Sequence, residues 1–103
     1  EMHALFPIWR RTTGEMARSF IRRGFRAIIT CVDGEKLDGG FVGRDYDEAF
    51  LTDLPDGVDP CGENGEFHSF VYAGPIFRAP IAVRRGEVVL RDDRFHYCDL
   101  LPE

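Results

Sequence analysis

The sequence predicts an α/β fold, and three features of the chain support this. Arginines and apolar residues recur at helical spacing over about three turns before Gly24. An apolar run follows at once, from Phe25 to Val32. Residues 67–72 then change character with period two, and several short strand-like segments complete the chain. We therefore expect an α/β domain that ends in a small antiparallel β meander.

The first predicted helix has a start signal and a stop signal. Thr12 and Glu15 have the spacing of a capping box, which satisfies the first backbone N–H groups of a helix. Gly24 ends the pattern, as glycine does after many helices. The apolar stripe expected to face the core consists of Met16, Phe20 and Ile21.

The run from Phe25 to Val32 is nearly continuous and rich in β-branched residues, which is typical of a strand buried on both faces. Such strands occur in parallel sheets, so we expect the preceding parallel strands to lie upstream of Glu1. Cys31 is then a small core residue. Asp33 follows the strand at its carboxyl end, where open parallel sheets place functional groups, although Asp is also common in turns.

A second, shorter helix is expected before Pro55, where Asp45 and Glu48 repeat the capping-box spacing. Its acids suit the positive end of the helix dipole, which explains them better than catalysis does. Arg44 precedes them in acidic surroundings, and we predict that it contacts an anion.

The stretch Gly57–Phe70 is rich in glycine, proline and acids, which suits a sharply turning loop whose main chain a ligand can approach. Within it stand Glu63, Asn64 and Glu66, followed by His68. Such groups orient substrates, accept protons or hold cations, whereas the alternative is a solvated acidic corner. If a strand begins here, Glu66 and His68 point to the same side of it.

The tail predicts a meander of three strand-like segments, 80–83, 87–91 and 94–98. Arg85-Gly86 and Asp92-Asp93 are the expected turns. We expect this part of the chain to be structural.

Length and composition predict a single domain or a fragment of one, since the chain has 103 residues and is 44% apolar. We divide it into a helix–strand–helix part (1–55) and a loop with the meander (56–103). The chain begins with Glu1 rather than Met, which indicates a fragment. The net charge of -5 is concentrated in the middle third, so general nucleic-acid binding is not expected. No membrane-spanning run occurs and the three cysteines cannot all pair, which favours a cytoplasmic protein with reduced thiols.

The wording Asp-Pro-Cys-Gly-Glu-Asn-Gly-Glu-Phe-His-Ser-Phe-Val at 59–71, followed by Gly74-Pro75, resembles the signature of the diphthine-ammonia ligase family. These proteins are ATP pyrophosphatases related to the adenine nucleotide alpha hydrolases. Phe6–Arg10, Gly24–Ile29 and Gly43-Arg44 follow the family's order, so the resemblance covers most of the chain. It implies the C-terminal part of a HUP-like (PP-loop ATP pyrophosphatase) parallel-sheet domain. The family's Ser-Gly-Gly-Lys-Asp nucleotide loop does not occur in this sequence and would lie upstream.

The resemblance implies an ATP-dependent amide ligase, in which ATP activates a substrate carboxylate as an acyl adenylate and ammonia attacks it. The implied partners are ATP with Mg²⁺, a carboxylate-bearing substrate and ammonia, and a homodimer is left open. His68 stands where the archaeal-type motif often has Glu, which leaves the acceptor substrate open. The implied catalytic residues are Glu63 and Glu66. The implied substrate-binding residues are Cys61, Gly62, Asn64, Gly65, His68 and Arg44.

The alternative function is a non-catalytic binding module with an acidic pocket for a small amine or cationic ligand. Two other kinds of site are disfavoured. Zinc on Cys61, His68, His96 and Cys98 fits no established ligand spacing. Covalent catalysis by Cys61 is disfavoured because Glu63 and Glu66 would raise the pKa of its thiol.

Overall fold

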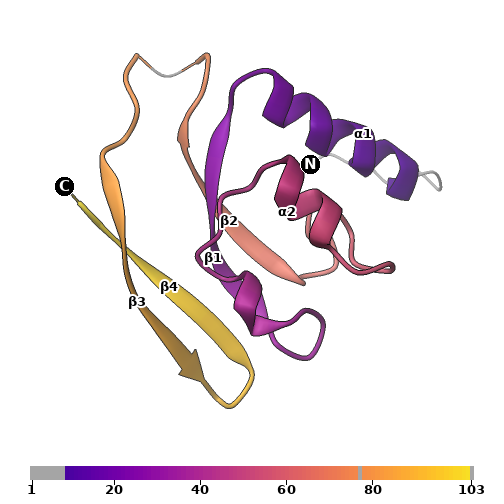
Figure 1. Cartoon of the computed structure of the whole chain (residues 1–103), viewed down its shortest axis with the longest axis vertical. Coiled ribbons are helices and arrows are strands. Elements are labelled where there is room, and N and C mark those ends of the chain that lie inside the picture. Colours follow the sequence, from indigo (N-terminus) through magenta and orange to yellow (C-terminus); the bar gives the residue numbers. More distant parts are fainter. Residues whose placement is uncertain (1–8, 77, 103) are drawn as a thin grey trace.

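The computed structural model describes residues 9–76 and 78–102, which form a four-stranded sheet with two α-helices (Figure 1). None of the helices in these ranges is long and apolar enough to span a membrane. In chain order the elements are α1 (Trp9–Arg22), β1 (Arg26–Asp33), the 3-10 helix η1 (Gly39–Phe41), α2 (Glu48–Asp53), β2 (Phe67–Ala73), β3 (Val83–Arg91) and β4 (Phe95–Pro102).

The sheet has the strand order β2-β1-β4-β3, and its neighbouring strands are antiparallel. The predicted α/β class is confirmed, but β1 is not a strand of a parallel sheet within the described residues. Its burial has another cause. The segment around Asp45 bridges to Ile28 and donates and accepts main-chain hydrogen bonds along β1, which shields the part of β1 that β4 does not reach.

Helix α1 begins earlier than the capping-box spacing predicts, so Thr12 lies inside it. Its end is as predicted: Gly24 has φ +93, its N–H donates to the carbonyl of Ile21, and the N–H of Phe25 donates to the carbonyl of Phe20. This is a Schellman motif, and the rings of Phe20 and Phe25 stack 4.7 Å apart across it. The predicted stripe is wrong at Met16, which is 55% exposed, because Ala17 and not Met16 shares the buried face with Phe20 and Ile21.

The core lies where α1, α2, β1 and β2 meet, and Phe50 of α2 is at its centre with no exposed surface. Its ring packs edge-on against Phe41 and Phe67 and tilted against Tyr46. The cap of α2 differs from the prediction: Asp47, not Asp45, accepts the N–H of Phe50. The first and second parts of the chain therefore share one core and one sheet.

The tail forms one long hairpin rather than three short strands (Figure 1). Arg85 and Gly86 do not form a turn, because they lie within β3 at a register shift, where the strand bulges. The turn at Asp92 and Asp93 is confirmed. Both residues have positive φ, the pattern of a type I′ hairpin turn, and the N–H of Arg94 donates to the carbonyl of Arg91.

The contrast between Phe50 and Met16 is testable. Phe50→Ala should lower the free energy of unfolding by about 3–5 kcal/mol, because it leaves a cavity among packed rings. Met16→Ala should change it by less than about 0.5 kcal/mol, because the side chain is largely in solvent. Urea denaturation of both variants measures this, and equal losses would contradict the helix orientation.

Candidate functional site

Asp59 organises the first half of the loop at residues 57–66, here called the motif loop. Its side chain is buried, and each carboxylate oxygen is in use. Oδ1 accepts from the hydroxyl of Thr13 at 2.8 Å, and Oδ2 accepts from the N–H groups of Cys61 at 2.9 Å and Glu63 at 3.1 Å. One carboxylate thus joins α1 to the loop and holds the main chain at Glu63.

Glu66 closes the second half of the motif loop from inside. It is 3% exposed. Its Oε1 accepts from the N–H of Asn64 at 3.0 Å, and its Oε2 accepts from the N–H of Asp59 at 2.8 Å and the side-chain amide of Asn64 at 3.4 Å. A buried carboxylate requires such donors. Glu66 therefore stabilises the loop from inside, and both of its carboxylate oxygens accept from the loop's own donors.

Two glycines let the chain wrap around these carboxylates. Gly62 and Gly65 have φ +67 and +79, and their N–H groups donate to the carbonyls of Asp59 and Gly62. A Cβ on Gly62 would lie 2.8 Å from the carbonyl oxygen of Phe67. At Gly62 the close approach that glycine allows is therefore to the protein's own main chain rather than to a ligand.

This wrapping leaves Glu63 and Asn64 exposed at the tip of the motif loop. The carbonyl of Asn64 accepts from Lys36 Nζ at 2.7 Å, which fixes the tip against the turn after β1. The strand pattern predicts that Glu66 and His68 point to the same side, and this prediction is wrong. Glu66 precedes β2 and its side chain turns back into the loop, whereas His68 lies on β2 and is exposed.

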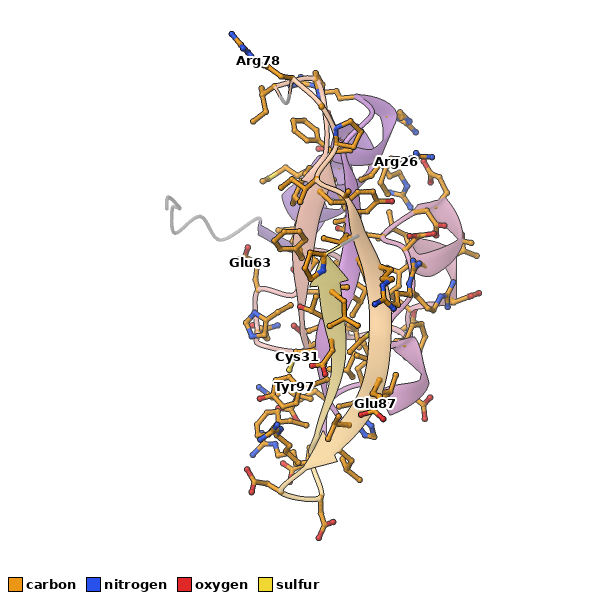
Figure 2. All side chains as sticks on the ribbon, turned by 90° about the vertical axis from the view of Figure 1, so that its left-hand side faces the viewer. Arg26, Cys31, Glu63, Arg78, Glu87 and Tyr97 are labelled. Atoms are coloured by element: carbon orange, nitrogen blue, oxygen red, sulfur yellow. The ribbon has the colours of Figure 1, made fainter. Side chains whose placement is uncertain are left out.

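A pocket of about 550 Å³ adjoins the loop, on the same side of the molecule as Glu63 and away from α2 (Figure 2). Its floor follows the strand register: Cys31 of β1 lies opposite His68 of β2 and Tyr97 of β4. Gly65, Ser69, Phe70, Phe95 and Asp99 also line it. The pocket therefore combines the end of the motif with side chains from the tail.

Sequence reasoning missed the role of four residues of this site. Cys31 lines the pocket instead of filling the core, because the register of β1 shifts at this point. Tyr97 and Asp99 lie in the tail that the sequence marks as structural; their period-two spacing on one strand was the available signal. Asp59 was read only as part of the motif, although a buried Asp among glycines is a usual organiser of a loop.

The thiols of Cys61 and Cys31 are not activated as nucleophiles. Cys61 is half-buried and its thiol donates to the carbonyl of Thr13 at 3.4 Å. Burial raises the pKa of Cys61 to about 11, with further increases from the carboxylates of Asp59 and Glu63. Burial also raises the pKa of Cys31, although the hydrogen bond with Tyr97 opposes this. The sequence predicts that Glu63 and Glu66 raise the pKa of Cys61. The pKa is raised, but the contributing carboxylates are those of Asp59 and Glu63.

Arg44, the predicted anion contact, is engaged within the protein. Its guanidinium pairs with Asp53 at 3.0 Å and lies over the rings of Phe41 and Phe50, at 5.3 and 5.7 Å. These contacts place it beside α2. Its role as an anion contact remains a prediction.

Asp33 holds the end of β1 to the tail hairpin. Arg94 donates two hydrogen bonds to its carboxylate, at 2.8 and 2.7 Å, and the N–H of Asp33 donates to the carbonyl of Glu66. The hydrogen bonds from Arg94 lower the pKa of Asp33 to about 2. Asp33 also accepts from the N–H of Glu35, as a turn Asp does, so it lines the pocket while serving structure.

The motif loop fits neither a metal ion nor the phosphates of ATP. Within residues 9–76 and 78–102 no three His, Cys, Asp or Glu side chains converge on a common metal position. A phosphate cradle needs backbone N–H groups that point at the ligand. Here the N–H groups of Asp59, Cys61, Glu63 and Asn64 already donate to Asp59 or Glu66.

Comparison with known proteins shows the family of the chain. The sequence profile described as "Diphthamide synthase C-terminal domain" matches residues 12–100. The chain belongs to this family. Its curated relatives include the diphthine--ammonia ligase of Homo sapiens, 33% identical over 94 residues, and that of Danio rerio, 29% identical over 98 residues. These alignments cover 86% and 90% of the chain but 35% and 38% of the relatives, so the chain spans about a third of their length.

In the diphthamide synthase C-terminal domain described here, the motif loop and the tail hairpin are brought together at Asp33. Its main chain contacts Glu66 and its side chain contacts Arg94. Asp33 therefore connects the family's sequence motif to the tail hairpin, which forms the other side of the pocket.

The low pKa of Asp33 makes the stability of the domain pH-dependent. The unfolded carboxyl has a pKa of about 3.9, so its contribution is present above that pH and is lost as the pH falls towards about 2. Arg94→Gln should flatten the dependence of the unfolding free energy on pH in this window, measured by urea denaturation. Arg91→Gln, in the same hairpin, is the control. Identical pH profiles for both variants would contradict the assignment.

Proposed function

We propose that this chain is the acceptor-side domain of an ATP-dependent amide ligase of the diphthine–ammonia ligase type. One observation carries the proposal: a family motif presents an exposed carboxylate, Glu63, on a loop that is held from inside by Asp59 and Glu66 and whose Gly65 lines a pocket of about 550 Å³. ATP, with Mg²⁺, would supply adenylation of the substrate carboxylate. We assign its binding to a HUP-like parallel-sheet part that precedes this domain in the full-length protein, because the motif loop has no phosphate cradle.

The two predicted catalytic carboxylates have different roles in this proposal. Glu63 is exposed, so it can attract ammonium and accept one proton from it. The ammonia then attacks the acyl carbon of the adenylate; the C–N bond of the amide forms, the acyl C–O bond to AMP breaks and AMP leaves, and the second proton of the nitrogen passes to solvent. Glu66 acts through the main chain of the loop, because it is buried and donors occupy both its oxygens. It is a positioning residue.

The pocket suits the acceptor side chain. His68 and Tyr97 stand on either side of Cys31 across three neighbouring strands, and Ser69 adds a hydroxyl at the rim. These groups donate hydrogen bonds to a carboxylate or carbonyl oxygen, while Phe70 and Phe95 supply apolar walls. His68 of the family motif thus lines the same pocket as Phe95 and Tyr97 of the tail hairpin.

The test uses the full-length protein with candidate carboxylate substrates and ammonium. Glu63→Gln should keep substrate-dependent ATP-to-pyrophosphate exchange and lose amide formation by about 10²- to 10⁴-fold, as the loss of a general base does. Glu87→Gln, an exposed glutamate on β3 that is distant in Figure 2 from Glu63, is the matched control.

Two outcomes contradict the proposal in different ways. If Glu63→Gln forms amide at the rate of Glu87→Gln, Glu63 has no role in ammonia attack. If the full-length protein turns over no nucleotide with any carboxylate, the ligase assignment fails and a binding module for a small amine or cation becomes the better account.

A further inference from the structure

We propose that Asp59 is the positioning residue that fixes the main chain of Glu63, and that it ties this position to helix α1 through Thr13. The inference rests on the proposed function, since it names the residue through which the ammonia-side carboxylate is oriented. Asp59 belongs neither to the implied catalytic residues nor to the implied substrate-binding residues.

Asp59 occupies the centre of the hydrogen-bond network of the motif loop. Its Oδ2 accepts from the N–H of Glu63 itself, and its own N–H donates to Glu66. It is 3% exposed, so these bonds are shielded from competing water. The main chain of Glu63 is therefore fixed directly by Asp59, and Glu66 reaches it only through the neighbouring residues.

The same carboxylate connects the loop to α1. Thr13 is buried on α1, and its hydroxyl donates to Asp59 Oδ1 while its carbonyl accepts from the Cys61 thiol. A displacement of α1 would thus be transmitted to the loop through the side chains of Asp59 and Cys61. The contact therefore links the position of α1 to the main chain of Glu63.

The geometry requires an acceptor oxygen that faces the N–H groups of Cys61 and Glu63 at this position. Asn keeps such an oxygen, because its N–H₂ group can turn towards the hydroxyl of Thr13, which also accepts. Glu would add a methylene in a buried site. Asp59→Ala removes the acceptor of the Glu63 N–H, whereas Asp59→Asn retains it.

The first experiment compares Asp59→Ala with Asp56→Ala, at an exposed neighbour, in the full-length protein. Asp59→Ala should lower kcat for amide formation by about 10- to 100-fold, the effect of a small misplacement of a reacting group, while pyrophosphate exchange equals that of the control. Thr13→Val, which removes the hydroxyl and keeps the shape, should lower kcat in the same direction by less. Equal amide rates in Asp59→Ala and Asp56→Ala, or parallel loss of exchange and amide formation, would overturn the proposal.

A second measurement does not depend on ligase activity. In the 103-residue chain, the amide of Glu63 should exchange with solvent slowly in the wild type and at least about tenfold faster in Asp59→Ala, because its acceptor is lost. Fast exchange of the Glu63 amide in the wild type overturns the proposal even if no ligase substrate is found. Slow exchange in an inactive full-length protein supports the positioning and sinks only the ligase assignment.

Discussion

The structure depends on one constraint: two carboxylates, Asp59 and Glu66, lie inside a small domain and must be satisfied there. Their partners are neutral N–H and O–H groups, mostly from the backbone of a single loop. Each buried donor or acceptor left without a partner would cost about 1–3 kcal/mol, so the loop is held to the path that places its amides on these oxygens. The shape of the loop is a consequence of this requirement.

Several features follow from that path. The glycines at 62 and 65 supply the backbone angles that ordinary residues reach poorly, and the chain between them turns outward. Glu63 and Asn64 are therefore exposed, but the main chain at the tip of the loop is held, since Lys36 donates a hydrogen bond to the carbonyl of Asn64. Asp33 joins the loop to the tail hairpin, so the two sides of the pocket that Gly65 and Tyr97 line are connected through one residue.

The sequence allowed prediction of the features that depend on local chemistry. Gly24 as the end of a helix, the positions of β1 and β2, and the turn at Asp92 follow from propensity and spacing. The motif wording pointed to the family, and the profile match confirmed it. These signals lie within a few residues of the feature they predict.

The remaining features depend on tertiary contacts, which local patterns do not contain. A strand buried by helices, by an antiparallel neighbour and by the segment at Asp45 reads like a strand of a parallel sheet, so the direction of pairing could not be inferred from β1. Met16 and Ala17 are adjacent, and only packing decides which faces the core. The inward turn of Glu66 depends on amides that surround it after folding, and the pocket role of Tyr97 depends on its register with Cys31.

The central claim is that the protein's own carboxylates shape the motif loop before any ligand binds. The most direct measurement is detection by NMR of scalar couplings across the hydrogen bonds from the amides of Asp59 and Asn64 to the carboxyl carbon of Glu66, in the ligand-free chain. Both couplings should be present, because the bonds are 2.8 and 3.0 Å long and shielded from water. Couplings that are absent without ligand and arise only when substrate is added would contradict the account.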